Sequence, residues 1–168
     1  INGFRNTPSV SVNKTYNFIN PKAGLTYNHN TTQASLSWTL ANKEPNRDDF
    51  EASVTEQPRH ETLHDVELNL SRALGKHTTI GGTFYYMAYR NQLILTGRIN
   101  DVGAYTRQNI ARSYRAGVEL QATTRFGSYV NLSANLALSR NKIKSFNEFI
   151  DDYDNGGQKT VTHSDKDI

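Results

Sequence analysis

The sequence predicts an all-β protein whose antiparallel strands form part of a transmembrane β-barrel. Three short polar corners, near Asn30, Lys76 and Gly127, each lie between two stretches that alternate between apolar and polar residues. Long polar stretches separate one strand pair from the next. A sheet with short turns at one end and long loops at the other is typical of a barrel in an outer membrane.

The first strand pair surrounds the corner near Asn30. Its residues of one parity are apolar: Ala23, Leu25 and Tyr27 before the corner, and Ala34, Leu36, Trp38 and Leu40 after it. The residues between them are polar or glycine. A period of two indicates strands with one apolar face.

The second pair surrounds Lys76. Glu67 lies on the polar parity in mid-strand, whereas Leu68 and Leu70 continue the apolar parity. Arg72 interrupts that parity close to the corner. We expect either a shift of register or a side chain that extends to the nearby membrane interface.

The third pair shows the clearest alternation, from about 113 to 126 and from 129 to 139. One parity is apolar: Tyr114, Ala116, Val118, Leu120, Ala122 and Phe126, then Val130, Leu132, Ala134, Leu136 and Leu138. The other parity of the strand before the corner holds no large apolar side chain. A stretch of about eleven residues has the length of a membrane-spanning strand.

Aromatic residues lie near the ends of the apolar faces, as interfacial girdles require. Tyr27 and Phe126 are near the short turns, and Trp38, Tyr86 and Tyr114 are nearer the long stretches. A soluble β-sandwich also alternates, so a soluble adhesin or carbohydrate-binding module stays open as an alternative. Detergent dependence would distinguish the two classes.

Composition excludes several other classes. The chain is 36% hydrophobic, with no apolar run near the ~20 residues of a membrane helix. It has no cysteine, and its net charge of +3 comes from basic residues scattered among acidic ones, unlike a nucleic-acid surface. No arrangement typical of an enzyme is found. We count about six to seven strands, fewer than the eight of the smallest barrels, and expect a section of a larger barrel.

Several strings of residues resemble a known family. The first is Asn20-Pro21-Lys22-Ala23-Gly24-Leu25-Thr26-Tyr27, followed by Ala34-Ser35-Leu36-Ser37-Trp38 and by Ala41-Asn42-Lys43-Glu44-Pro45-Asn46-Arg47-Asp48-Asp49-Phe50. Further matches follow in order: Glu61 with Glu67-Leu68, Phe84-Tyr85-Tyr86 with Tyr89-Arg90-Asn91-Gln92-Leu93, and Asn109 with Gly117-Val118-Glu119-Leu120. Together they resemble the barrel of TonB-dependent outer-membrane receptors, most closely the iron-complex (siderophore) type of Bacteroidetes.

The resemblance implies that residues 1–168 are a section of this barrel domain in the bacterial outer membrane, with the plug domain and the C-terminal strands absent. It implies a receptor, not an enzyme, that imports a scarce nutrient, foremost an iron–siderophore complex. Its partners would be the nutrient ligand, outer-membrane lipid and, through the plug, the TonB–ExbB–ExbD system, with no nucleic acid. A cobalamin or oligosaccharide importer is the alternative within transport.

Two groups of charged residues are candidate site residues. Glu44, Arg47, Asp48 and Asp49 lie in the loop beyond Trp38 and are candidates for ligand contact, although internal pairing or simple solvation also accounts for them. Glu67, Arg115, Glu119 and Arg125 are expected to line the lumen and face the plug. No catalytic residue, cofactor or metal site is expected. His60 and His64 lie in a segment that is expected to lead into a strand, where four residues span ~13 Å, too far to share an ion.

Overall fold

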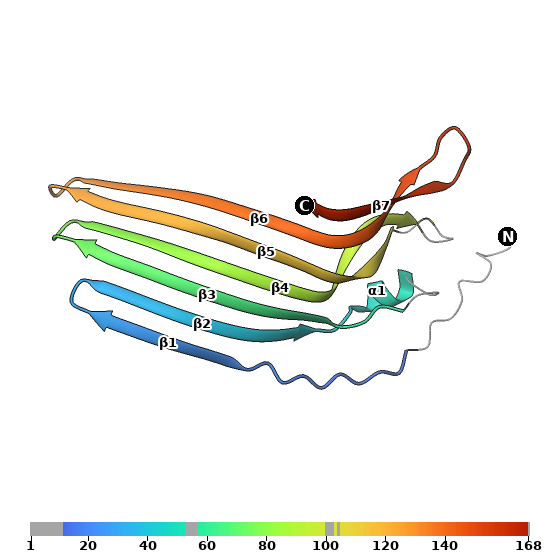
Figure 1. The fold of residues 1–168 in the computed structure, drawn as a ribbon, viewed down its shortest axis with the longest axis horizontal. Coiled ribbons are helices and arrows are strands. Elements are labelled where there is room, and N and C mark those ends of the chain that lie inside the picture. Colours follow the sequence, from blue (N-terminus) through green and yellow to red (C-terminus); the bar gives the residue numbers. More distant parts are fainter. Residues whose placement is uncertain (1–11, 53–56, 100–102, 104, 168) are drawn as a thin grey trace.

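The computed structural model describes residues 12–52, 57–99, 103 and 105–167, and within them a single seven-stranded sheet is found (Figure 1). Every strand is antiparallel to the next, and the order across the sheet is the order along the chain. The elements are β1 (Lys22–His29), β2 (Thr32–Lys43), α1 (Arg47–Ala52), β3 (Glu61–Leu74), β4 (Thr78–Ile99), β5 (Tyr105–Phe126), β6 (Val130–Asp151) and β7 (Gln158–Asp167). The predicted antiparallel all-β fold of six to seven strands is confirmed.

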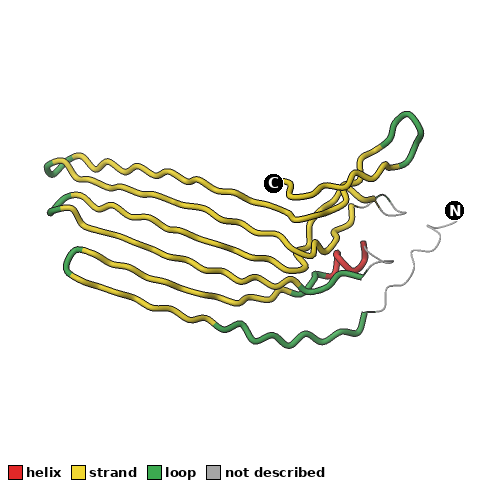
Figure 2. The backbone as a smooth tube through the Cα atoms, viewed as in Figure 1, coloured by secondary structure: helices red, strands yellow, loops and turns green. Residues whose placement is uncertain are grey.

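The three tight turns lie at one end of the sheet, where the sequence predicts them (Figure 2). Each turn contains a residue with left-handed backbone: Asn30 with φ 49°, Gly75 with φ 73° and Gly127 with φ 57°. Asparagine and glycine adopt this conformation at the least cost. The chain therefore reverses in very few residues here, and β2, β4 and β6 all end at the opposite end of the sheet.

The strands are longer than the alternation indicates. β4, β5 and β6 have 22 residues each, so much of the polar sequence expected to form loops is strand. At ~3.3 Å per residue such a strand spans ~73 Å, whereas the apolar band of an outer-membrane barrel is ~25 Å tall. Beyond that band neither face of the sheet meets lipid, and the alternation that reveals a strand stops. At the other end, β6 begins at Val130, because Tyr129 belongs to the turn.

Successive hairpins are staggered. Thr32, which begins β2, pairs with Arg72, two residues before β3 ends. Thr78, which begins β4, pairs with Thr124, two residues before β5 ends. On average each strand is displaced by one residue relative to its neighbour, which is ~3.3 Å along the strand for ~4.8 Å across it. The strands are therefore tilted by ~35° from the perpendicular to the line that joins the three turns. Barrel strands are tilted by a similar angle, about 35–45°.

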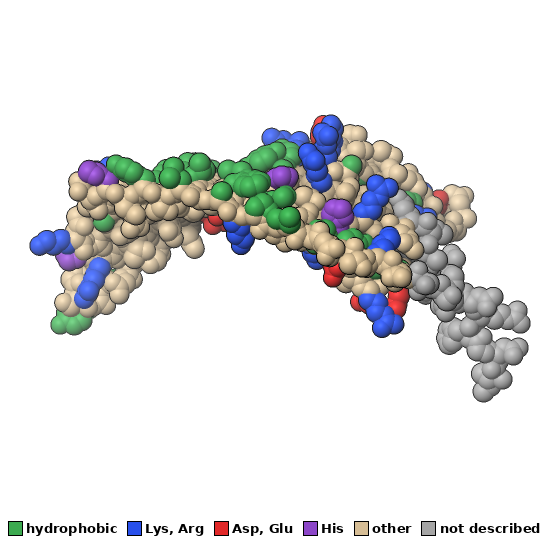
Figure 3. Space-filling model, turned by 90° about the horizontal axis from the view of Figure 1, so that it is seen from below, with side chains coloured by type: hydrophobic (Ala, Val, Ile, Leu, Met, Phe, Trp, Pro, Cys, Tyr) green, Lys and Arg blue, Asp and Glu red, His purple; other side chains and the backbone are tan. Residues whose placement is uncertain are grey.

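The two faces of the sheet differ as predicted. Successive register partners form one apolar row across it: Leu25, Leu36, Leu68, Phe84, Val118 and Leu138. These side chains are not covered: Leu36 is 48% exposed and Leu138 is 62% exposed. Figure 3 shows apolar side chains gathered on the convex side of the molecule. A sandwich would bury this face against a second sheet. No second sheet is present in the described residues, which favours a lipid-facing wall.

Aromatic rings mark the loop side of the apolar face. Trp38 and Tyr86 flank Val66 in one row, and Tyr86 stacks on Tyr114 of the next row with ring centroids 5.8 Å apart. The predicted girdle is therefore present on this side. At the turn side, Arg72 keeps its place on the convex parity, and its register with β4 is unbroken. A register shift is thus the wrong explanation for Arg72, and extension to the interface remains.

A small core lies at the loop end. Among the described residues the buried hydrophobic side chains are Phe50, Ile110 and Ile143. A bulge between Leu95 and Ile99 turns the tip of β4 toward β6 and β7. There the Nε2 of Gln158 donates to the Gly97 carbonyl at 2.8 Å. Within the described part of the chain, no helix has the length and apolar character to cross a membrane.

Candidate functional site

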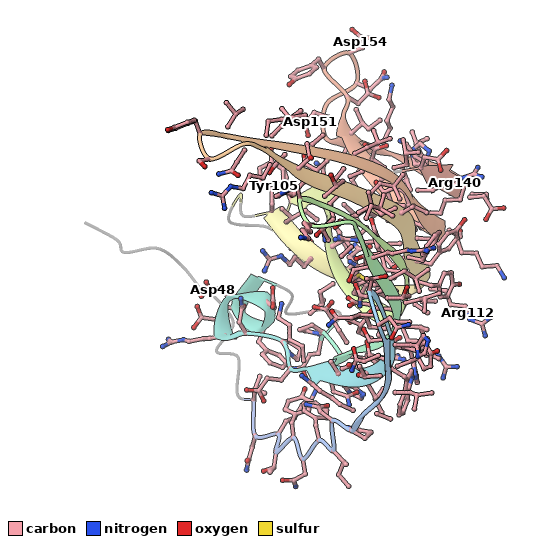
Figure 4. All side chains as sticks on the ribbon, turned by 90° about the vertical axis from the view of Figure 1, so that its left-hand side faces the viewer. Asp48, Tyr105, Arg112, Arg140, Asp151 and Asp154 are labelled. Atoms are coloured by element: carbon pink, nitrogen blue, oxygen red, sulfur yellow. The ribbon has the colours of Figure 1, made fainter. Side chains whose placement is uncertain are left out.

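The candidate site combines the concave face of the sheet with the structures at its loop end. Figure 4 views the molecule from the turn end and shows Asp48 and Tyr105 on the concave side, with α1 beside the wall. Strand parity decides which side chains reach this face, and Figure 4 shows the sheet curved around it. A polar concave surface of this kind can receive a ligand or a protein segment from the loop end.

The four predicted lumen residues share the concave parity. Glu67 lies beside Ser37 and Tyr85, whereas Glu119 lies beside Thr83 and Ala137. The guanidinium carbon of Arg115 is 5.6 Å from the centroid of the Tyr89 ring, and Arg125 donates to the Gly127 carbonyl at 3.1 Å.

The structure distributes these four charges along the wall and does not bring them together. Glu67 and Glu119 are two strands apart, Arg115 lies nearer the loops and Arg125 is at the turn end. Within the described residues, none of the four takes part in an ion pair. The two carboxylates, Glu67 and Glu119, therefore remain available to whatever occupies the concave side.

Asp65 is a concave-face residue that sequence reasoning missed. Its partners in register are Thr39 and Met87, and Met87 in turn pairs with Arg115. The Oδ1 atom of Asp65 is buried and has no hydrogen-bond partner in the described structure. An unpaired buried carboxylate oxygen is costly, which favours a partner supplied from outside this sheet. The signal was available in the sequence, since Asp65 shares the parity of Glu67.

Gly117 leaves room on the concave face for the side chain of Tyr85, its register partner on β4. At Gly117 the phenol of Tyr85 occupies the space: an added Cβ would lie 2.5 Å from its hydroxyl oxygen. A residue larger than glycine at this position would therefore collide with Tyr85.

A polar hollow of about 370 Å³ lies toward the turn end of the concave face. Its lining consists mainly of hydroxyl and amide side chains, including Thr26, Asn28, Gln33, Asn69 and Gln121. Thr83 donates to Asn69 at 2.7 Å, which holds that amide in place. Such a lining offers hydrogen bonds without a fixed charge. It suits a polar segment or ligand more than an ion.

Asp49 holds α1 in place at the loop end. Its carboxylate accepts the backbone N–H of Asn46 at 2.9 Å, and its own N–H donates to the Asn46 side chain at 2.8 Å. This reciprocal pair caps the first turn of the helix. The other carboxylate oxygen accepts from Arg107 of β5 at 3.0 Å. Asp49 is only 7% exposed, so the structure gives it an internal pairing.

The remaining loop candidates are exposed. Arg47 forms an ion pair with Glu51 at 2.6 Å one helical turn away, and this hydrogen bond raises the pKa of Arg47 further. Glu44 and Asp48 are exposed and make no ion pair within the described residues. The structure therefore separates the group into one buried anchor, Asp49, and three side chains open to the solvent.

The hairpin of β6 and β7 forms a second projection at the loop end. Hydrogen bonds from Asn155 lower the pKa of Asp152, so its carboxylate stays charged and organises the turn. Further down, the hydrogen bond with His163 at 2.6 Å lowers the pKa of Glu148. These contacts give the projection a defined shape.

The histidines singled out by spacing contact aromatic rings. The ring of His60 is 5.3 Å from Phe18, and that of His64 is 6.2 Å from Trp38. In the part of the chain that the structure describes, no group of three or more His, Cys, Asp or Glu residues is placed to hold a metal ion.

The comparisons with known proteins agree with this geometry. The family model described as TonB dependent receptor-like, beta-barrel matches residues 2–164. No curated protein matches the chain. The match covers nearly the whole chain, and the family accounts for a tilted sheet with an apolar convex face and a polar concave face. The chain belongs to the TonB-dependent receptor-like β-barrel family of bacterial outer-membrane proteins.

Proposed function

We propose that this protein imports a scarce nutrient in the form of an iron–siderophore complex. Its family consists of receptors that act in nutrient import with TonB and are not enzymes. The finer assignment rests on the strings between Asn20 and Phe50, which resemble the iron-complex type. In this proposal the chain supplies barrel wall and extracellular loops. Further strands beside β1 and β7 close the barrel, because an open sheet edge is not stable in lipid.

The observation that carries the proposal is the polar concave wall, which lies below the loop end where α1 and the β6–β7 hairpin are found. In this proposal the exposed side chains of Glu44, Arg47 and Asp48 meet the ligand first, since all three lie in the segment between β2 and α1 or in the first turn of α1 at the loop end. Below them the wall presents Asp65 and Glu67, followed by the polar hollow. A ligand captured at the loops therefore has a hydrophilic route along the wall.

The wall charges have a specific part in this proposal. Asp65, Glu67 and Glu119 have no ion-pair partner in the described residues, and basic groups on a plug domain would satisfy them. The TonB–ExbB–ExbD system would then rearrange the plug and open the lumen. Hydrogen bonds and ion pairs that are individually weak allow this rearrangement without unfolding the wall.

Uptake by cells tests the ligand class. A strain lacking the gene for the whole receptor is supplied in turn with radiolabelled ferric hydroxamate and catecholate siderophores, with cobalamin and with oligosaccharides. We expect the loss to abolish TonB-dependent uptake of one ferric siderophore. Loss of cobalamin or oligosaccharide uptake alone, with iron uptake intact, would overturn the siderophore assignment and leave the family unaffected.

A double variant tests whether the loop residues contact the ligand. We expect Glu44→Ala with Asp48→Ala to weaken ligand binding at least about five-fold, because each removes an exposed charge at the entrance. Lys159→Ala, a single change in exposed β7, serves as a surface control. Heat-resistant migration on a gel confirms that the barrel is intact. Unchanged affinity in the double variant would mean that these charges are only solvated.

A further inference from the structure

A basic cluster borders the apolar convex face at its loop side. It consists of Arg90 on β4, Arg112 on β5, and Arg140 and Lys142 on β6. All four share the convex parity, and Lys142 is the register partner of Tyr114 in the aromatic girdle. Figure 4 shows Arg112 and Arg140 pointing away from the concave side. In Figure 3, Lys and Arg side chains rise at the loop side of the apolar band.

Two of these arginines face each other without an acidic partner. Arg90 and Arg112 are direct cross-strand partners, so their Cβ atoms are ~4.5–5.5 Å apart. Both side chains are exposed, and neither forms an ion pair within the described residues. Like charges directly opposite one another destabilise a sheet. A bound anion between them would reverse the sign of that contribution.

The other two basic residues are only partly neutralised. Arg140 lies 3.4 Å from Asp167, and Lys142 lies 4.0 Å from the same carboxylate oxygen. One carboxylate therefore serves two cations, and the cluster as a whole keeps a net positive charge. Lys142 also donates to the Asp165 carbonyl at 3.2 Å, which fixes its side chain against β7.

The height of the cluster identifies its surroundings. Arg140 is ten residues beyond Val130, the turn-end residue of β6. At ~3.3 Å per residue and a tilt of ~35°, it lies ~27 Å above the turns, which is the upper boundary of a ~25 Å apolar band. By the same arithmetic Arg90, twelve residues from Thr78, lies ~32 Å above the turns, and Arg112, fourteen residues from Phe126, lies ~38 Å above them. Arg140 is therefore at the depth of lipid headgroups, and the long side chains of Arg90 and Arg112, which start above it, can extend down toward the same layer.

We propose that this cluster binds the phosphate groups of an outer-leaflet lipid. Arginine suits this role because its planar guanidinium binds phosphate through two parallel hydrogen bonds. Below the cluster, the acyl chains of such a lipid would meet Val118, Leu138 and the rows beyond them. The stacked rings of Tyr86 and Tyr114 lie at the junction, where amphipathic rings are favoured.

The test uses the complete receptor purified in a neutral detergent. It is titrated with a diphosphorylated glucosamine lipid (lipid A), with the same lipid after removal of its phosphates, and with inorganic pyrophosphate, and bound lipid is counted by native mass spectrometry. We expect strong binding of the phosphorylated lipid only. Equal binding of the dephosphorylated lipid would overturn the proposal. Displacement of the lipid by an equal concentration of pyrophosphate would also overturn it, because it would indicate a site for free anions.

Variants locate the site on the molecule. Arg90→Gln with Arg112→Gln should weaken binding of the phosphorylated lipid by about 30-fold, since each basic residue at a membrane surface contributes ~1 kcal/mol. Arg72→Gln is the matched control, because Arg72 shares the convex face but lies near the turn end. Lipid affinity that is unchanged in the double variant, or reduced equally in the control, would refute the assignment. Heat-resistant gel migration confirms folding, and the wild-type comparison of the two lipids needs no variant.

Discussion

A single charge placed at Leu120 or at its neighbour Gln121 tests the orientation of the wall. Leu120 is on the convex face and 45% exposed, whereas Gln121 points to the concave side. Leu120 is six residues from Phe126, where β5 ends. At ~3.3 Å per residue and ~35° of tilt, that distance is ~16 Å along the barrel axis, near the middle of a ~25 Å band.

Arginine at such a depth costs ~2–4 kcal/mol, so Leu120→Arg should lower the folding equilibrium constant by about 30- to 700-fold. Gln121→Arg adds the same side chain one residue away but on a water-filled side, and we expect a cost below ~1 kcal/mol. The assay is reversible denaturant-driven folding of the complete receptor into lipid vesicles, followed by heat-resistant migration on a gel. Equal costs for the two variants, or a larger cost for Gln121→Arg, would refute the assigned faces.

Two further predictions concern packing and pH. Gly117→Ala should destabilise the barrel by ~1–3 kcal/mol, because the new methyl group would meet Tyr85. Gly24→Ala adds a methyl at an ordinary contact distance, 3.6 Å from the Leu36 carbonyl oxygen, and should have little effect on the urea midpoint. A midpoint unchanged by Gly117→Ala would show that Tyr85 does not hold this position. Because the pKa of Asp152 is lowered, its charged form stabilises the β6–β7 turn at every pH above the ordinary pKa of 3.8. This contribution is lost only as the pH falls through the lowered pKa. Cleavage by pepsin at the exposed Tyr153 should therefore increase only below pH 3.8, while Asp152→Asn should be cleaved at higher pH as well; identical pH profiles would contradict this account.

The alternation of side chains was sufficient to predict the strands inside the apolar band. From Val130 to Ser139 one parity faces lipid and the other faces water, so each residue reports its face directly. The corners at Asn30 and Gly127 were also readable, because few residue types accept a left-handed backbone. Outside the band the information disappears. In the upper half of β5 the side chains of Thr106, Ile110 and Ser113 are buried against other segments of the protein and not against lipid, so the mostly polar sequence there does not distinguish a strand from a loop.

The sequence by itself therefore determined the membrane-facing architecture, because burial in lipid imposes a period of two on every strand that crosses it. Contacts between distant segments were decided only by the tertiary structure. Asp49 looked like one of four equivalent loop charges until Arg107, 58 residues later, was brought to 3.0 Å from it. Likewise, the cross-strand contact of Arg90 with Arg112 depends on the register of β4 with β5. Register is a property of paired strands, and no single strand encodes it.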